Sequence, residues 1–184
     1  GVRKKILEDN KILCSVEPAN VDEESIKEGL LKEKASPESI SKNLAELKAN
    51  KISQRRTGEL VLGADSIIDL EGKIISKPSN RDEALQILRD LNGKTHHLIS
   101  SACISRNGSM IWNFSDKASL TMKQMSEKEL KAYLAKISDE ALYAYNVYQI
   151  EGEGQFLFSK IEGDKETIMG LPVKKIKDYL NNYK

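Results

Sequence analysis

Apolar runs typical of strands and apolar residues at helical spacing alternate irregularly along this chain. Short apolar runs bounded by turn residues predict strands, whereas apolar residues three and four apart predict helices with one buried face. Two pairs of runs are separated only by turn signals, at 69–72 and at Asn107-Gly108, so they predict antiparallel hairpins. The sequence therefore predicts an α/β protein (α+β mixed) with a central mixed β-sheet flanked by helices, and excludes a strictly parallel sheet.

The individual elements are predicted from local start and stop signals. Serine caps a helix well and proline is tolerated at its first position, so Ser36-Pro37-Glu38 predicts a helix start. Beyond it Ile40, Leu44 and Leu47 form one apolar stripe. Lys48 lies at the edge of that stripe, either as a snorkelling surface lysine or directed into a cleft. Further helices are predicted after Ser79 or Asn80, after the capping box at 126–129 and from Pro172. Strands are predicted at 60–62, 67–68, 73–75, 98–104, 110–114 and 155–158. The charged segment at 23–34 is predicted to be either a mobile excursion or a solvated helix.

A carboxylate and a lysine stand at opposite ends of the first predicted hairpin. Asp65 comes just past the predicted end of the strand at 60–62, and Lys77 follows the return strand at 73–75. Ligands of open α/β sheets gather at such strand ends. We therefore expect the two side chains to lie near each other, in an arrangement that suits a metal-bound polyphosphate. When each residue is considered alone, Asp65 is also explained as an aspartate in a turn, and Lys77 as a solvated surface lysine.

Size, charge and cysteine content narrow the class of protein. A length of 184 residues suits a single domain over 1–184 with a sizeable core. The net charge of +1 lacks the overall basic field of nucleic-acid-binding proteins, so no nucleic-acid partner is expected. Cys14 and Cys103 form no metal-ligand or disulfide pattern. No apolar segment is long enough to span a membrane, the first residues show no signal-peptide h-region, and unpaired cysteines are unusual in secreted proteins, so we expect a cytoplasmic protein without a membrane partner.

Blocks of sequence in a fixed order resemble one protein family. The stretch 63–78 has the form GADS-x(10)-KP. The segments 3–7, 20–23 and 44–49 precede it, and 81–84, 91–96, 148–152, 161–164 and 170–172 follow it. In their order and spacing these blocks resemble the Maf family of nucleoside triphosphate pyrophosphatases over nearly the whole chain. The resemblance implies a two-lobed fold with a cleft, similar to that of Maf proteins and inosine triphosphatases.

The chain departs from the family pattern in two places. The family has a strand and a serine motif before the arginine that matches Arg3, so we expect those residues to precede Gly1. The pyrimidine-selective branch has G-A-Y-G-I-Q-G where this chain has 145–152. Pyrimidine, 7-methyl-guanosine and broader triphosphates therefore stay open as substrates, and the departure favours a site that is less strictly selective for pyrimidines.

The resemblance implies a reaction and a set of residues for it. The reaction is hydrolysis of a nucleoside triphosphate between its α and β phosphates, which removes non-standard or surplus nucleotides. Cationic groups and a divalent cation (Mg, Mn or Co) neutralise the phosphate charge in such reactions. The implied catalytic residues are Asp65 as proton acceptor, Lys77 and Lys48, the implied substrate-binding residues are Arg3, Glu23 and Gln149, and the implied metal contacts are Asp65 and Glu23.

A second function from a different class is compatible with the same resemblance. The family has also been associated with a regulator that binds a nucleotide without turnover and acts in cell division and septum formation. The resemblance further implies a homodimer. His96 and His97 stand where a strand is predicted to begin, without a nucleophile pattern near them, so no catalytic role is expected for either.

Overall fold

The computed structural model describes residues 1–183. The chain forms two compact units: one contains residues 1–66, 99–117 and the segment from Glu166 onward, and the other contains Ile67–Leu98 and Ala118–Lys165. The helices are α1 (Val2–Asp9), α2 (Glu23–Lys32), α3 (Pro37–Ser53), α4 (Arg81–Leu91), α5 (Glu127–Ala135), α6 (Asp139–Tyr145), α7 (Lys165–Ile168) and α8 (Val173–Asn182), with a short 3₁₀ helix η1 (Glu153–Leu157). The strands are β1 (Val61–Leu70), β2 (Lys73–Ile75), β3 (Thr95–Arg106), β4 (Ser109–Met122) and β5 (Phe158–Glu162).

The strands form one five-stranded sheet in the order β2-β1-β3-β4-β5. β1 pairs antiparallel with β2, with Ile68 opposite Ile75, and β4 pairs antiparallel with β5. Asn107 and Gly108 connect β3 to β4 with φ values of 52° and 83°. Positive φ at both turn residues is the signature of a tight hairpin, which explains the Asn-Gly pair. The predicted α/β class, with a sheet that is not strictly parallel, is confirmed.

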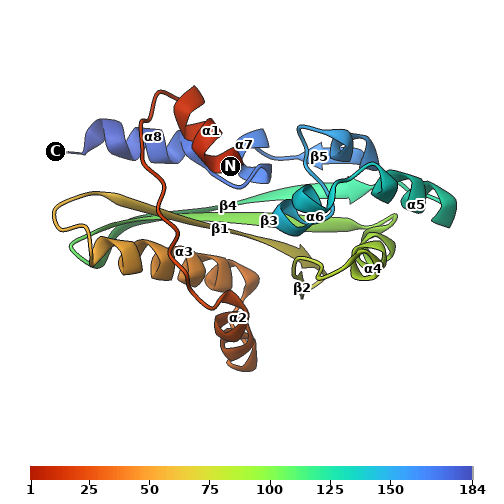
Figure 1. Cartoon of the computed structure of the whole chain (residues 1–184), viewed down its shortest axis with the longest axis horizontal. Coiled ribbons are helices and arrows are strands. Elements are labelled where there is room, and N and C mark those ends of the chain that lie inside the picture. Colours follow the sequence, from red (N-terminus) through yellow and green to blue (C-terminus); the bar gives the residue numbers. More distant parts are fainter. Residues whose placement is uncertain (184) are drawn as a thin grey trace. The chain divides into compact units, whose positions relative to one another are not determined.

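The first unit has helices on both faces of its part of the sheet (Figure 1). Successive strand residues point to opposite faces. Ala102 of β3 accordingly packs in a cluster with α1 and α8, whose buried members include Leu7 and Ile176, whereas the next residue, Cys103, packs against Ala45 and Ala49 of α3. The same alternation holds in β1, where Val61 contacts the α3 cluster and Leu62 the α1 and α8 cluster. Within 61–66, the part of β1 in the first unit, odd residues therefore face α3, and even residues face α1 and α8.

Helix α3 contacts the backbone of β1 directly at Gly63. A Cβ atom at this position would lie 2.3 Å from the carbonyl oxygen of Ala45 and 2.8 Å from the backbone nitrogen of Ala49. Real Cβ atoms do not approach backbone that closely, so only glycine permits this contact. The absent side chain at Gly63 thereby sets how near the residues of α3 come to the middle of β1.

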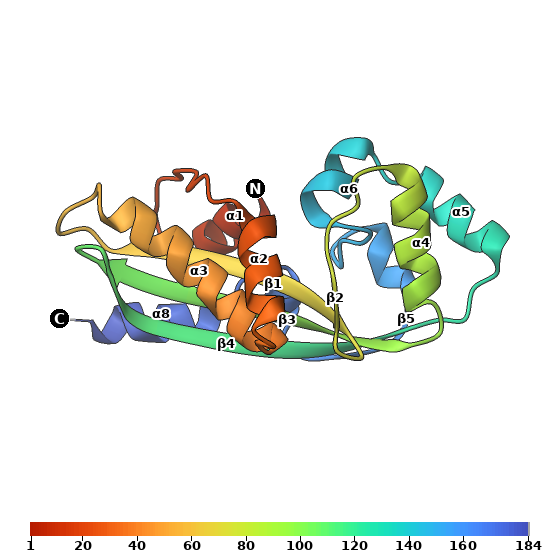
Figure 2. The same cartoon turned by 90° about the horizontal axis from the view of Figure 1, so that it is seen from below.

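The second unit is built around the paired helices α4 and α5, which lie side by side in Figure 2. Asn80 caps α4 by accepting from the backbone N–H of Glu83, and Ser126 and Glu129 form the predicted capping box of α5. Arg81 donates to the carbonyl oxygens of Leu134 at 3.0 Å and Ile137 at 2.6 Å. These carbonyls belong to the end of α5 and the turn after it, where a helix leaves acceptors unsatisfied. The first residue of α4 therefore ties down the connection from α5 to α6.

Several local predictions are wrong. Asp65 does not follow a strand, because β1 continues from Val61 to Leu70 and places Asp65 in its middle. Leu47 is 41% exposed and not part of the buried stripe of α3, since the chain turns that position away from β1. The residues from 155 to 157 belong to η1, and the strand begins only at Phe158. Helices α1 and α6 were not predicted, because neither has a strong apolar period in its sequence.

The charged segment at 23–34 is a helix, α2, and lies beside the start of α3 (Figure 2). Asp22 caps it by accepting from the backbone N–H of Ser25. Its first turn contains Glu23 and Glu24, where a negative charge is favourable.

Among the described residues, no helix has the length and apolar character needed to cross a membrane.

Gly63→Ala should lower the free energy of unfolding by about 3 kcal/mol, because the new methyl group forces α3 away from β1. Gly29→Ala is the matched control. Gly29 lies within α2, and a Cβ atom there would have nothing within 4 Å, so alanine should raise stability by about 0.5 to 1 kcal/mol. Urea unfolding of both variants checks the prediction. Equal stability of the two variants would contradict the close contact at Gly63.

Candidate functional site

The ammonium group of Lys48 lies between two carboxylates. Its Nζ is 2.6 Å from Oε1 of Glu23 and 3.2 Å from Oδ1 of Asp65, and it also donates to the carbonyl oxygen of Ala64 at 3.2 Å. Three elements bring these groups together: Glu23 begins α2, Lys48 lies on α3 and Asp65 on β1. The alternative that Lys48 is only a snorkelling surface lysine is therefore wrong, since its charged end is held by the site.

Local sequence accounts for this arrangement. Asp65 is an odd-numbered residue of β1 and faces α3, as Gly63 does. The hydroxyl of Ser41, also on α3, donates to the carbonyl oxygen of Asp65 at 3.1 Å and joins the first turns of that helix to the strand. The close contact at Gly63, the Ser41 bond and the Lys48 bonds thus hold α3 against successive residues of β1.

Asp65 is a buried carboxylate whose surroundings both oppose and favour its charge. Its exposed fraction is 4%, and its Oδ2 atom is buried without a hydrogen-bond partner among the described residues. Burial raises the pKa of Asp65 above its ordinary value, while the positive charges of Lys48 and Arg3 act in the opposite direction. An acceptor oxygen that is buried and not satisfied is the feature expected where a ligand supplies the missing partner.

Arg3 places a second cation near Asp65. Its Nε donates to the carbonyl oxygen of Gly170 at 2.9 Å, and its Nη2 donates to the hydroxyl of Ser66 at 3.2 Å. Burial lowers the pKa of Arg3, while the charges of Asp65 and Glu23 raise it. An arginine stays protonated in proteins, so the guanidinium remains a cation that can bind a phosphate oxygen through paired N–H groups.

The structure brings together four of the six predicted site residues. Arg3, Glu23, Lys48 and Asp65 all belong to the first unit and interact through the contacts and charges described above. Lys77 and Gln149 belong to the second unit. The predicted proximity of Asp65 and Lys77 stays a prediction.

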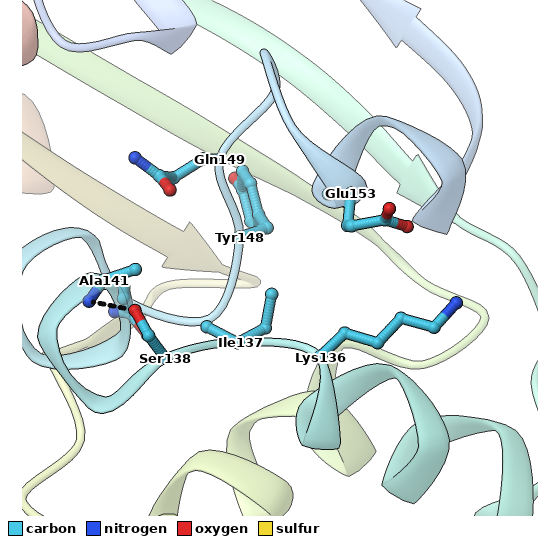
Figure 3. Close-up of a pocket in the computed structure, with 9 residues that line it drawn as sticks. Lys136, Ile137, Ser138, Ala141, Tyr148, Gln149 and Glu153 are labelled. Atoms are coloured by element: carbon cyan, nitrogen blue, oxygen red, sulfur yellow. Dashed lines mark hydrogen bonds between the residues drawn. The ribbon is translucent and has the colours of Figure 1, made fainter.

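Gln149 lines a cavity of about 250 Å³ in the second unit. In Figure 3, Tyr148 and Gln149 lie on one side of the cavity, opposite the turn that carries Ile137 and Ser138. Gly154 supports this segment closely, because a Cβ there would lie 2.6 Å from the carbonyl oxygen of Gln149. The remaining lining residues are Lys136, Ala141, Asn146 and Glu153. Polar side chains therefore outnumber apolar ones in the lining of this cavity.

His96 supports the same segment from the interior. Its Nε2 lies 2.8 Å from the hydroxyl of Tyr148, and its ring packs against those of Tyr148 and Phe158. The histidine is fully buried, and burial lowers its pKa to about 4. A neutral imidazole in a packed aromatic cluster fits the expectation that His96 is not a general base.

Sequence reasoning missed three residues that contact Arg3 or its partners. Ser66 and Gly170 bind its guanidinium, and the hydroxyl of Ser100 lies 2.9 Å from that of Ser66. Ser66 is part of GADS and Gly170 part of G-L-P, so both were in quoted motifs but had no role. Ser100 carried no local signal, because only strand pairing brings it beside Ser66.

The carboxylates of Asp65 and Glu23 suit a metal cation that is also coordinated by phosphate oxygens of a bound substrate. Within residues 1–183, no group of three or more His, Cys, Asp or Glu side chains is placed to hold a metal ion. Asp65 and Glu23 nevertheless share one ammonium group, and Oδ2 of Asp65 has no partner among those residues. Magnesium is commonly held by one or two carboxylates together with substrate phosphates. The residues therefore fit a cation bound with a polyphosphate, and they do not form a complete metal site by themselves.

A buried carboxylate in contact with an ammonium group and influenced by the charge of a guanidinium, on a sheet covered by helices, defines an α/β protein with a site for an anionic ligand. The family pattern described as Maf-like protein matches residues 1–183. The chain thus belongs to the Maf family, as its sequence blocks indicated.

Curated relatives match almost the whole chain. A protein of Pelagibacter ubique named nucleoside triphosphate pyrophosphatase is 76% identical over 98% of this chain and 92% of its own length. A protein of Caulobacter vibrioides with the same name is 39% identical over 98% of this chain and 90% of its own length. A protein of Bartonella quintana named 7-methyl-GTP pyrophosphatase is 40% identical over 93% of this chain and 85% of its own length.

His96→Gln should remove much of the loss of stability on acidification. The unfolded chain binds a proton at His96 below about pH 6.5, whereas the folded protein does so only near its pKa of about 4. The free energy of unfolding therefore falls as the pH drops through this window, by up to about 3 kcal/mol. The glutamine variant should lack this contribution.

His97→Gln, a change at the neighbouring and less buried residue, is the control and should keep most of the pH dependence of the wild type, because burial lowers the pKa of His96 more than the charge of His97 does. Urea unfolding of the three proteins at several pH values between 4 and 7 makes the comparison. An unaltered pH dependence in His96→Gln would show that His96 is not the buried neutral group.

Proposed function

We propose that this protein is a nucleoside triphosphate pyrophosphatase that hydrolyses its substrate to the nucleoside monophosphate and pyrophosphate. The observation that carries the proposal is the buried Asp65 carboxylate, which contacts Lys48, is influenced by the charge of Arg3 and has one oxygen without a partner among the described residues, in a chain 76% identical to a protein named for this activity. Water attacks the α-phosphorus, the bond to the β-phosphate oxygen breaks, and pyrophosphate leaves with that oxygen. The proton of the water goes to Asp65.

The main barrier to this reaction is negative charge on the phosphates. Arg3 is held by Gly170 and Ser66, so its guanidinium is oriented before a phosphate binds. Lys48 supplies a more mobile point charge next to Asp65. For Lys77 and Gln149 the proposed roles follow the family resemblance: Lys77 neutralises phosphate charge, and Gln149 orients the substrate by hydrogen bonds.

A divalent cation (Mg, Mn or Co) is proposed to be held by Asp65 and Glu23 together with substrate phosphate oxygens. Such an ion neutralises phosphate charge and acidifies bound water. Lys48 keeps the two carboxylates of the chain close together in its absence, because its ammonium contacts both.

The remaining expectations concern selectivity and cellular setting. The segment 145–152 departs from the pyrimidine-selective pattern, and one relative is named for 7-methyl-GTP. We therefore propose a base site that is not restricted to pyrimidines. A cytoplasmic homodimer is the proposed form, in keeping with two free cysteines and with the frequency of twofold assemblies.

Asp65→Asn should lower kcat/KM for pyrophosphate release by about a thousandfold, because the amide cannot accept the proton. Asp69→Asn, on the same strand, is the control and should keep wild-type activity, since its side chain only accepts from the backbone N–H of Gly72. Release is measured with dTTP, UTP, CTP and 7-methyl-GTP in the presence of manganese. If the wild type binds nucleotides but forms no product from any of them, the proposal of an enzyme is wrong and the nucleotide-binding regulator is favoured. Use of dTTP and UTP alone would contradict the proposed base selectivity.

Glu23→Gln should raise the Mn²⁺ concentration needed for half-maximal activity by about tenfold, because it removes one charged ligand of the cation. Glu24→Gln is the matched control, since Glu24 lies next to it in the first turn of α2 and pairs with Lys27 of the same helix. Titration of activity with Mn²⁺ after removal of metal by EDTA measures the effect. Full activity of the wild type in excess EDTA would rule out the proposed metal requirement.

A further inference from the structure

A row of hydroxyl groups connects Arg3 to the interior of the first unit. Nη2 of Arg3 lies 3.2 Å from the hydroxyl of Ser66 on β1, which lies 2.9 Å from the hydroxyl of Ser100 on β3. Ser100 in turn lies 2.6 Å from the carbonyl oxygen of Thr167. Ser100 and Thr167 are fully buried. Four groups from α1, β1, β3 and α7 are therefore joined by three consecutive hydrogen bonds.

The direction of each hydrogen bond follows from the groups themselves. A carbonyl oxygen only accepts, so the one hydrogen of the Ser100 hydroxyl is used toward Thr167. Ser100 can then only accept from Ser66, so the hydrogen of Ser66 serves this contact of 2.9 Å and not the longer one of 3.5 Å to the carbonyl oxygen of Gly170. A guanidinium only donates, and Ser66 accepts from it. The donation runs one way from Arg3 through Ser66 and Ser100 to Thr167, and aligned bonds of this kind polarise one another.

Both ends of this row are anchored. The hydroxyl of Thr167 donates to Oδ2 of Asp116 at 2.6 Å, which fixes the segment that carries the last acceptor. At the other end, Nε of Arg3 donates to the carbonyl oxygen of Gly170 at 2.9 Å. Gly170 has a φ of +113°, and a Cβ there would lie 3.3 Å from Nε of Arg3. Two hydrogen bonds from one rigid guanidinium to fixed acceptors set the orientation of its plane.

The hydroxyl row is separate from the contacts of Asp65. Ser66 and Asp65 are neighbours in β1 and point to opposite faces of the sheet. Asp65 contacts Lys48 of α3, whereas Ser66 contacts Arg3 of α1. Removal of the Ser66 hydroxyl therefore leaves the hydrogen bonds of Asp65 with Ser41 and Lys48 in place.

We propose that Ser66 and Ser100 are positioning residues, which hold the guanidinium of Arg3 in the orientation that binds a substrate phosphate. The proposal rests on the proposed function, since it gives Arg3 a phosphate to bind. Orientation before binding reduces the entropy lost when the phosphate arrives, so the two serines act on affinity more than on the chemical step.

Ser66→Ala and Ser100→Ala should each raise KM for the nucleotide by about tenfold with kcat changed less than twofold. Because the hydroxyls act in series, the double variant should raise KM no further than Ser66→Ala does. Ser66→Thr, which keeps the hydroxyl, should restore the wild-type KM. Ser101→Ala is the matched control: Ser101 is also buried on β3, but its hydroxyl pairs with Ser115 on the other face, so KM should not change.

A second measurement does not depend on turnover. Exchange of the Arg3 Nε proton, followed by nitrogen-15 NMR, should be faster in Ser66→Ala and Ser100→Ala than in the wild type and in Ser101→Ala. An equal rise of KM in Ser101→Ala, or unaltered exchange at Arg3 in Ser66→Ala, would contradict the positioning role. Absence of pyrophosphate release from the wild type would instead contradict the proposed function, while the exchange measurement would still test whether the serines hold Arg3.

Discussion

The arrangement of the site depends on the missing side chain at Gly63. Because no Cβ stands there, the backbone of α3 reaches β1, and residues on that face of the helix meet the strand one after another. Ser41 bonds to the backbone of Asp65, and Lys48 bonds to Ala64 and to the carboxylate of Asp65. A bulkier residue at position 63 would move all these donors together. The chemistry of the site is thus a consequence of one packing contact.

That contact also explains how a carboxylate stays in the interior. Burial of Asp65 without partners would be costly, and its raised pKa records this cost. The ammonium of Lys48 and the guanidinium of Arg3 offset it from opposite faces of β1, and each is itself held by backbone carbonyl oxygens. The charge of Asp65 is offset by these cations, but its hydrogen bonding is incomplete, since Oδ2 lacks a partner among the described residues. A site in this condition is prepared for a charged ligand.

The sequence predicted most of the helices with strong caps, because Ser36, Asn80 and Ser126 use interactions within a few residues. It also singled out Asp65 from its place beside an apolar run and Lys48 from the edge of an apolar stripe, whereas Arg3 and Glu23 came only through the ordered family blocks. The strand position of Asp65 was wrong because the polar pair Asp65-Ser66 interrupts an apolar run that nonetheless continues as β1. Ser100 was missed because its neighbour Ser66 is 34 residues away, and no local pattern reports a pairing of that separation.

Arg3 and Gly170, the acceptor of its Nε, are far apart in the sequence. Arg3 belongs to the first helix, whereas Gly170 lies 167 residues later, just before the last helix. During synthesis the acceptor of Nε at Gly170 therefore becomes available only long after Ser66, the acceptor of Nη2, has been made. Contacts between such distant residues form late because their loop must close first. A chain that stops before Gly170 keeps the Ser66 acceptor but lacks the one for Nε, so its guanidinium is held by one of the two hydrogen bonds only.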